Sequence, residues 1–177
     1  MAVLKLIRGK YQNEDAIDNL VSYVLNKEKM PSECYGGRGV SLNNPIYSMK
    51  IIKNVYGQVA GKQAEHFILA FDDGEYPNLT LENIYHLAYS ICEFFRDVQV
   101  LFALHEVKNT YLSDDYEDDA LHLHFVVNTV NLGTGQKFRI NFDNEFDLKY
   151  HILNVLEYNG ISNDVKLVVD KKEAFSR

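Results

Sequence analysis

The hydrophobic pattern of this chain shifts between a two-residue period and a 3.6-residue period, which predicts strands alternating with helices. Short runs rich in β-branched and large apolar residues predict the strands. They are expected at residues 2–8, 65–71, 98–107, 121–131, 137–141 and 165–169. The turn Gly133-Thr134-Gly135 predicts that residues 137–141 pair with the preceding strand as a hairpin.

Three longer segments carry apolar residues at helical spacing, and each begins near a capping residue. These helices are expected at about residues 11–29, 80–96 and 143–158. In the first helix, Ile17, Leu20 and Val24 lie on one apolar stripe. Tyr23 lies about 130° from the centre of that stripe. Tyr23 is therefore not expected in the core, and its hydroxyl is expected to face a cleft or solvent.

The order of these elements indicates the fold class. Residues 31–45 contain Pro, Gly and Asn and are expected to form a loop, while residues 46–55 fit either a helix or a strand. Neighbouring strands joined by a loop and a glycine turn indicate mainly antiparallel pairing. We predict an α+β fold, with one mainly antiparallel central sheet and helices packed mostly on one face.

Composition and charge narrow the class of protein. With 177 residues, 46% hydrophobic and 24% charged, the chain has the balance of a soluble globular protein. No apolar run approaches the ~20 residues of a membrane helix. Two cysteines, Cys34 and Cys92, make no disulfide framework, so a reducing cytoplasm is expected. The net charge of −7 is unusual for a nucleic-acid protein, but part of it lies in residues 113–119.

The candidate chemistry lies on the strand at residues 121–131. His122 and His124 are two positions apart, so they project to the same face of a strand. His105, on the preceding strand, can face both if the two strands pair. Three neutral imidazoles leave coordination positions open for substrate and water, which is typical of a catalytic metal site. The alternative is one surface histidine and one core histidine with no metal between them.

Four segments in order along the chain resemble the motifs of the plasmid mobilisation relaxases. That family belongs to the superfamily of nucleases with a His-hydrophobe-His (HUH) motif. The matching segments are residues 19–29, 65–75, 122–131 and 135–139. The resemblance implies that residues 1–160 form a relaxase nuclease domain. Residues 161–177 are then a short C-terminal extension, at which an accessory region would begin.

The resemblance also implies a reaction. Such proteins nick one strand of plasmid DNA at an origin of transfer during conjugation. A tyrosine attacks the phosphodiester and stays joined to the 5′ phosphate, which leaves a free 3′ hydroxyl. By motif position the nucleophile would be Tyr23, which precedes the histidine pair as in relaxases; Tyr11 and Tyr35 flank it and are the alternatives. The metal ligands would be His105, His122 and His124.

A divalent cation is the implied cofactor. The resemblance suggests Mg²⁺ or Mn²⁺, whereas ligation by imidazole alone suits zinc, nickel or copper. His66 and Asn128 are expected to support the ligands from behind, although His66 is alternatively a DNA contact or a structural histidine at a strand end. The implied partners are single-stranded DNA at the origin, accessory relaxosome proteins and a coupling protein. Candidates for backbone phosphate contacts, as opposed to plain solvated surface, are Lys27, Lys29, Arg38, Lys137 and Arg139.

Two positions depart from the family pattern. Ala120 stands where family members often have a further histidine, and Ala70 stands where serine is usual. Together with the net charge of −7, these departures favour a second interpretation, a non-catalytic DNA-binding or accessory protein on the same fold. A third interpretation is a small metal-binding or phosphodiesterase domain with superficial similarity. Retention of Tyr23 and the three histidines favours the strand-transferring enzyme.

Overall fold

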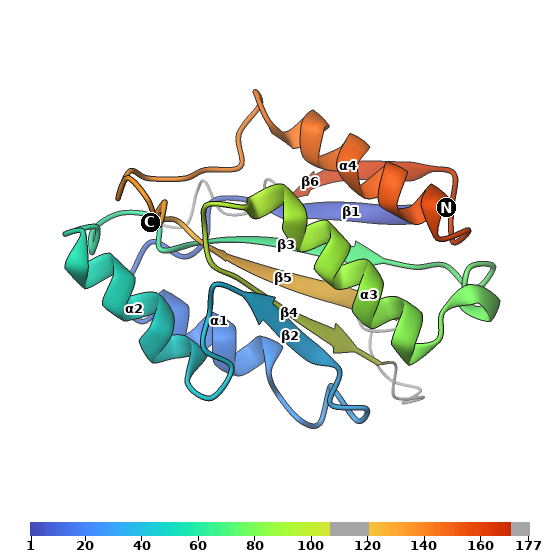
Figure 1. Cartoon of the computed structure of the whole chain (residues 1–177), viewed down its shortest axis with the longest axis horizontal. Helices are drawn as coiled ribbons and strands as arrows, with labels where there is room; N and C mark the ends of the chain where they lie inside the picture. Colours follow the sequence, from blue (N-terminus) through green and yellow to red (C-terminus); the bar gives the residue numbers. More distant parts are fainter. Residues whose placement is uncertain (107–120, 171–177) are drawn as a thin grey trace.

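A computed structural model of the protein describes residues 1–106 and 121–170, and one six-stranded sheet forms its centre (Figure 1). The strand order is β2-β4-β5-β3-β1-β6. The strands are β1 (Ala2–Ile7), β2 (Tyr35–Arg38), β3 (Ala64–Ala70), β4 (Val100–His105), β5 (His122–Asn128) and β6 (Val165–Asp170). Every neighbouring pair is antiparallel except β1 and β6, which are parallel. The predicted α+β class with a mainly antiparallel sheet is confirmed.

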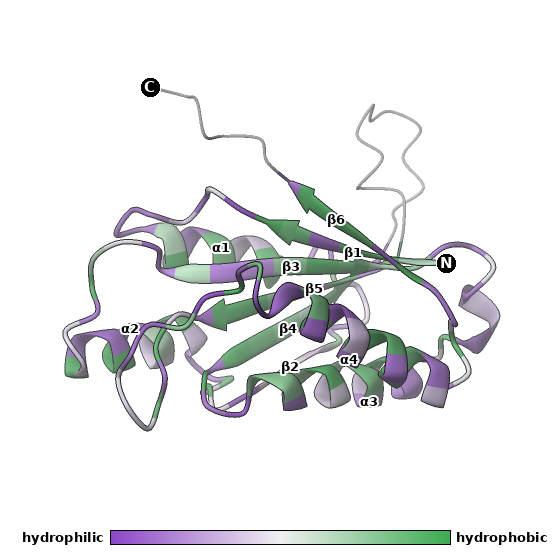
Figure 2. Ribbon diagram, turned by 90° about the horizontal axis from the view of Figure 1, so that it is seen from above, coloured by the Kyte–Doolittle hydropathy of each residue, from purple (hydrophilic) through white to green (hydrophobic). Residues whose placement is uncertain are grey.

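Helices lie on both faces of this sheet. In the described part of the chain they are α1 (Ala16–Val24), α2 (Pro45–Val55), α3 (Leu81–Cys92) and α4 (Glu145–Tyr158), with 3-10 turns at Tyr76–Asn78 and Glu93–Phe95. Helices α3 and α4 lie side by side on one face, and α1 packs on the other face over β4 and β5 (Figures 1 and 2). Helix α2 packs beside α1. The helices are therefore shared between the two faces, rather than placed mostly on one. None of them is long and apolar enough to cross a membrane.

The central strands explain this two-sided arrangement, because their side chains are buried on both faces. On β5, Phe125 belongs to the core under α3 and α4, whereas Val126 belongs to the core under α1. Side chains of a strand alternate between faces, so the even-numbered positions of β5 all point toward α1. His122 and His124 therefore lie on the α1 face of the sheet.

Strand β2 lies in a segment that the sequence predicted as loop, and that prediction is wrong. Its glycines indicated a turn, but here they permit close packing of an edge strand. Gly36 pairs with Phe102 of β4, and a Cβ at Gly36 would lie 2.6 Å from the Phe102 ring. Residues 46–55, for which helix and strand were both open, belong to α2, whose first turn is capped by the Asn44 side chain.

The predicted hairpin strand at residues 137–141 is also wrong. Only one isolated bridge, between Val130 and Lys137, forms in this region of the described chain. The Asn131 side chain accepts hydrogen bonds from the backbone of Gly133 and Thr134, so the turn itself is present. Beyond it, the Asn144 side chain donates to the carbonyl of Arg139 and directs the chain toward α4 instead of along β5.

Strand β6 joins residues beyond 160 to the sheet. It pairs with β1 over its whole length, and Ile161 and Val165 are buried in the core with α4. The division into residues 1–160 and 161–177 stays a prediction. The acidic segment 113–119, Ala120 and residues 171–177 lie outside the described residues.

A chain that ends at residue 160 is expected to be much less stable than one that ends at residue 170. The shorter chain loses Ile161 and Val165, whose burial contributes roughly 3–6 kcal/mol, and leaves the edge of β1 unpaired. This loss is a large share of the roughly 5–15 kcal/mol by which a domain is stable. Urea unfolding of both chains measures the difference. Equal midpoints would show that residues 161–170 are an appendage and not part of the domain.

Candidate metal centre

Three histidines from two paired strands meet on the α1 face of the sheet. In the antiparallel pair β4–β5, His105 lies opposite His122, and Ala103 lies opposite His124. All three imidazoles are buried, and their ligand nitrogens lie within 4.8 Å of one another. The ring centroids of His105 and His124 are 4.1 Å apart. The strand register thus brings together the three histidines that the sequence pattern predicted as ligands.

Within the described chain, hydrogen bonds account for His105 Nε2 and His124 Nδ1 and leave His124 Nε2 for a cation. His105 Nε2 lies 2.8 Å from the carbonyl oxygen of Val24 at the end of α1. A carbonyl only accepts, so Nε2 carries the proton and Nδ1 carries the lone pair. His124 Nδ1 lies 2.9 Å from His66 Nε2, while His124 Nε2 is buried with no hydrogen-bond partner among the described residues. Such a group costs roughly 1–3 kcal/mol, and a bound cation would remove that cost.

Burial also keeps His124 in the form that binds metals. Desolvation holds the pKa of His124 well below its ordinary value, and repulsion from the neighbouring histidines adds to this effect. Desolvation likewise lowers the pKa of His66 to about 3. Neutral imidazole is the ligand form, since protonation removes the lone pair. The residues present therefore fit a divalent cation held by three histidines.

Tyr23, in the last turn of α1, lies against these histidines. Its ring centroid is 5.5 Å from that of His124 and 5.7 Å from that of His105. The side chain is 42% exposed, in agreement with its predicted position off the apolar stripe. The Lys29 ammonium lies 4.4 Å from the centre of the Tyr23 ring. One tyrosine is thus both open to solvent and in contact with the histidine cluster.

The two alternative tyrosines are placed differently. The Tyr11 hydroxyl lies 2.7 Å from His66 Nδ1, so His66 stands between Tyr11 and His124. Tyr35 lies on β2, where it is partly buried against the core under α1. Among the ring contacts described, it is Tyr23 that meets both His105 and His124.

Three of the five predicted phosphate contacts do not form one surface. They are Lys27, Lys29 and Arg38. Lys29 lies beside Tyr23, and Lys27 is exposed, 3.4 Å from the Glu33 carboxylate. Arg38 lies on the other face of the sheet, on the same side as the α3 layer, and pairs with Glu93 at 2.9 Å. The strand position of Arg38 therefore does not favour the predicted phosphate contact.

Lys137, Arg139 and Asn128 lie toward the other end of β5. The Lys137 ammonium donates to the carbonyl of Ala60, and the Arg139 guanidinium lies 4.0 Å from the Glu65 carboxylate. Asn128 is four residues from His124, which is about 13 Å along a strand. Its side chain donates to a carbonyl of α2 and to the Gln99 side chain, both 3.1 Å or closer. The structure does not bring Asn128 to the histidine cluster.

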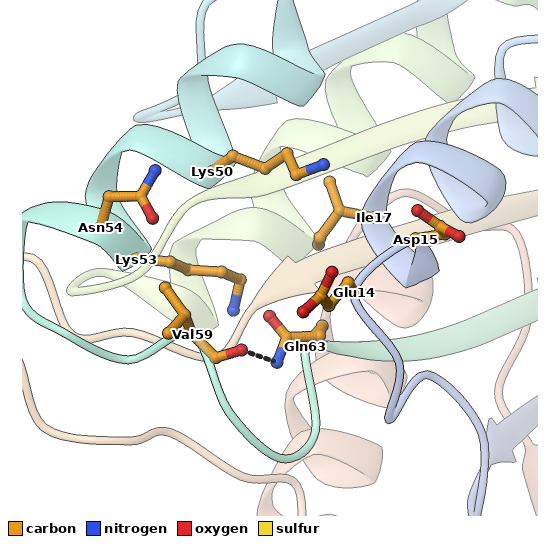
Figure 3. Close-up of a pocket in the computed structure, with 8 residues that line it drawn as sticks. All are labelled: Glu14, Asp15, Ile17, Lys50, Lys53, Asn54, Val59 and Gln63. Carbon is orange, nitrogen blue, oxygen red and sulfur yellow. Dashed lines mark hydrogen bonds between the residues drawn. The ribbon is translucent and has the colours of Figure 1, made fainter.

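A cavity of about 320 Å³ lies between the start of α1 and the second half of α2 (Figure 3). Its lining residues are Glu14, Asp15, Ile17, Lys50, Lys53, Asn54, Val59 and Gln63. Lys53 is 3% exposed, donates to the Thr129 hydroxyl, and has no carboxylate within 4.0 Å in the described chain. Burial lowers the pKa of Lys53 to about 8, and the positive charges of Lys137 and Arg139 add to the effect.

Replacing Lys53 by Met is expected to stabilise the protein at neutral pH. The folded-state pKa of about 8 lies below the ordinary value of 10.5, so the folded protein releases this proton first. The contribution of Lys53 to the free energy of unfolding is therefore lowest below pH 8 and rises as the pH rises from about 8 to 10.5. Met removes the cost of the buried charge, for a gain of about 1–2 kcal/mol at pH 7 that shrinks toward pH 10.

Thermal unfolding across that pH range measures the effect of Lys53→Met. The matched control is Lys50→Met, because Lys50 lies one helical turn away, is half-buried and pairs with Asp18. The control is expected to change stability by less than about 0.5 kcal/mol at every pH. A gain in Lys53→Met that is the same at pH 7 and pH 10 would show that the buried charge is not its cause.

Three buried imidazoles beside an accessible tyrosine define a candidate metal-assisted nuclease centre. The model of the relaxase family described as MobA/VirD2-like, nuclease domain, matches residues 23–155, a segment that begins at Tyr23 and contains all three histidines. The chain belongs to this relaxase family, as its motifs predicted, and is in general terms a DNA-nicking enzyme.

One solved structure, described as "Molecular Basis of Vancomycin Resistance Transfer in Staphylococcus aureus", is similar with a TM-score of 0.48 and 14% identity. That similarity covers 77% of this chain and 75% of the other, and it is too distant to bear on function. Among curated proteins, none matches this sequence.

Proposed function

We propose that this protein cuts one strand of DNA at an origin of transfer by transesterification, in the conjugative mobilisation of a plasmid or other mobile element. In this proposal Tyr23 is the nucleophile, and His105, His122 and His124 hold a divalent cation. The contact of the Tyr23 ring with His105 and His124 carries the proposal, because it joins an accessible hydroxyl-bearing side chain to the candidate metal centre.

The proposed reaction exchanges one phosphodiester for another. The Tyr23 oxygen forms a bond to phosphorus, and the bond from phosphorus to the 3′ oxygen breaks. The tyrosine proton goes to water or a base, and the 3′ oxygen gains a proton and leaves as a hydroxyl. The protein is then joined to the 5′ phosphate. Because one phosphate ester replaces another, the 3′ hydroxyl can attack the joint later and restore the strand.

In this step, residues of α1 orient the nucleophile and one of the metal ligands. Helix α1 holds Tyr23 at its end, and the Val24 carbonyl next to it fixes the His105 ring. The same helix terminus therefore positions both the nucleophile and one ligand. A cation bound to the histidines would neutralise charge on a phosphate oxygen as the phosphorus is attacked.

The cofactor in this proposal is Mg²⁺ or Mn²⁺, while zinc, nickel and copper suit the same three imidazoles by ligand preference. Single-stranded DNA at the origin is the proposed substrate, with accessory relaxosome proteins and a coupling protein as partners in the cytoplasm. Lys29, beside Tyr23, is the proposed phosphate contact closest to the reaction. Lys27, Lys137 and Arg139 would contact more distant phosphates.

A non-catalytic DNA-binding protein on the same fold is the second candidate, and the net charge of −7 favours it. The buried Nε2 of His124, which has no hydrogen-bond partner among the described residues, weighs against it. In a protein that binds no cation, the buried nitrogen would only lower the free energy of unfolding. An apolar side chain at that position would then give a more stable fold.

An adduct-trapping experiment tests the proposal without knowledge of the origin sequence. The protein is incubated with a pool of single-stranded DNA and Mn²⁺, and material that stays joined to protein in denaturant is recovered and sequenced. A label at the 3′ end of a recovered strand is expected to move with the protein, whereas a 5′ label is expected to leave with the free 3′ hydroxyl piece. The opposite polarity, or no adduct from a folded and metal-loaded protein, would overturn the proposal.

A further inference from the structure

Behind His124, a line of hydrogen bonds leads away from the histidine cluster to Tyr11. His124 Nδ1 lies 2.9 Å from His66 Nε2, and His66 Nδ1 lies 2.7 Å from the Tyr11 hydroxyl. The ring planes of His66 and His124 are nearly parallel, inclined by 17°, with centroids 5.1 Å apart. Three segments distant in sequence thus form one line that ends at the buried Nε2 of His124.

The protons along this line of hydrogen bonds can be arranged in two ways, called two settings, because each neutral imidazole carries one proton. In the first, Tyr11 donates to His66 and His66 donates to His124, which places the His124 proton on Nε2. In the second, His124 donates from Nδ1 to His66, and His66 donates from Nδ1 to the Tyr11 oxygen. Only the second setting leaves the lone pair of His124 on Nε2, the atom that has no partner among the described residues.

We propose that Tyr11 and His66 are positioning residues that hold His124 as its Nδ1–H tautomer and so present its Nε2 lone pair to the cation. This inference rests on the proposed metal centre. A histidine that binds a metal almost always donates its other N–H to an acceptor, which fixes the tautomer and the ring orientation. His105 has such an acceptor in the Val24 carbonyl, which can do nothing but accept.

His124 differs from His105, because its acceptor is itself an imidazole. An imidazole nitrogen either donates or accepts, so His66 fixes the tautomer of His124 only if its own tautomer is fixed. Tyr11 supports that tautomer in the second setting, where its oxygen accepts from His66 Nδ1. The phenol can also donate, so the cation, which needs the Nε2 lone pair of His124, selects this setting.

The backbone around Tyr11 holds it in place for this role. Tyr11 has a φ of 69°, in a region that costs a non-glycine residue of order 1–3 kcal/mol. Its carbonyl accepts a hydrogen bond of 2.7 Å from the backbone of Gln63, which leads into β3 and His66. The strained residue is thus tied to the strand that carries its partner. The same geometry places the Tyr11 hydroxyl behind His66, which favours Tyr23 over Tyr11 as the nucleophile.

Calorimetric titration with Mn²⁺ tests the inference. Replacing His66 by Leu removes the acceptor and is expected to weaken binding about 10- to 100-fold. Replacing His66 by Gln restores an acceptor oxygen and is expected to recover most of that loss. Replacing Tyr11 by Phe is expected to weaken binding roughly 2- to 10-fold. The control is His86→Leu, an exposed histidine on α3, which is expected to change nothing.

A second measurement reads the tautomer directly and does not depend on activity. Long-range ¹H–¹⁵N spectra of the zinc-loaded protein are expected to show His124 protonated at Nδ1, and spectra of metal-free His66→Leu are expected to show both tautomers. Unchanged Mn²⁺ affinity in folded His66→Leu and Tyr11→Phe would overturn the positioning role alone. A wild-type protein that binds neither Mn²⁺ nor Zn²⁺ would overturn the metal centre and the inference with it.

Discussion

Replacing Tyr23 by Phe is expected to abolish the covalent protein–DNA adduct while cation binding and folding stay unchanged. The substitution removes one oxygen atom from a side chain that is 42% exposed, so little packing is lost. The ring contacts with His105 and His124 remain available to Phe. Loss of a nucleophile typically lowers the rate by a factor on the order of 10³ or more. Adduct formation should therefore fall below detection.

Quantitative gels of adduct against time, at saturating Mn²⁺, measure this effect. The matched control is Tyr47→Phe, because Tyr47 is an exposed tyrosine on α2 that is not among the described ring contacts of the histidines. Tyr35→Phe and Tyr11→Phe test the two alternative nucleophiles. Survival of the adduct in Tyr23→Phe, with its loss in Tyr35→Phe, would move the nucleophile to the edge strand. Survival in all three would remove these tyrosines from the reaction.

The histidine cluster was predictable because it depends on local rules. Alternation along a strand places His122 and His124 on one face, and pairing of consecutive strands brings His105 beside them. The off-stripe position of Tyr23 likewise follows from helical periodicity, and the structure adds that this side of α1 meets the cluster. Periodicity thus gave the faces of His122, His124 and Tyr23, strand pairing placed His105, and the family resemblance assigned Tyr23 to the metal centre.

The supporting residues depend on long-range register, which periodicity does not contain. His66 reaches His124 because β3 pairs with β5 in a register that sets Ile68 opposite His124 and leaves His66 on the diagonal. Tyr11 joins them through a left-handed backbone conformation that its residue type does not favour. Asn128 lies on the same face of the sheet as the ligands, but it is four residues from His124 along β5 and does not reach them. Sequence spacing alone could not tell Asn128 from His66 as a supporting group.

Glycine misled the prediction at β2 for a related reason. The run Tyr35-Gly36-Gly37-Arg38 has the composition of a turn. The need for small residues there comes from tertiary neighbours, among them Phe102 across the strand pair and Tyr89 of α3. The same error affects the interpretation of Arg38. In a loop, the Arg38 side chain could lie on either face of the sheet, but in an edge strand it lies on the α3 face, where it pairs with Glu93.

Replacing His124 by Ala is expected to remove the stabilisation that a divalent cation gives to the fold. A ligand at 100 times its dissociation constant stabilises a folded protein by about 2.7 kcal/mol. His124 contributes the buried Nε2 that has no protein partner in the described chain, so the variant loses the ligand with the strongest need for a cation. We expect at least a 100-fold loss of Mn²⁺ affinity and, with it, loss of the DNA adduct.

The informative quantity for His124→Ala is the rise in the melting temperature on adding Mn²⁺, compared with the same protein in chelator. Removing a buried imidazole lowers stability under both conditions, so the difference still reports the cation alone. The control is His151→Ala, because His151 lies on α4 at the opposite face and hydrogen-bonds the Ser90 carbonyl. His151→Ala should keep the full cation-dependent rise. If His124→Ala kept it as well, the cation would bind elsewhere, and the contact between Tyr23 and the histidines would no longer link the nucleophile to a metal.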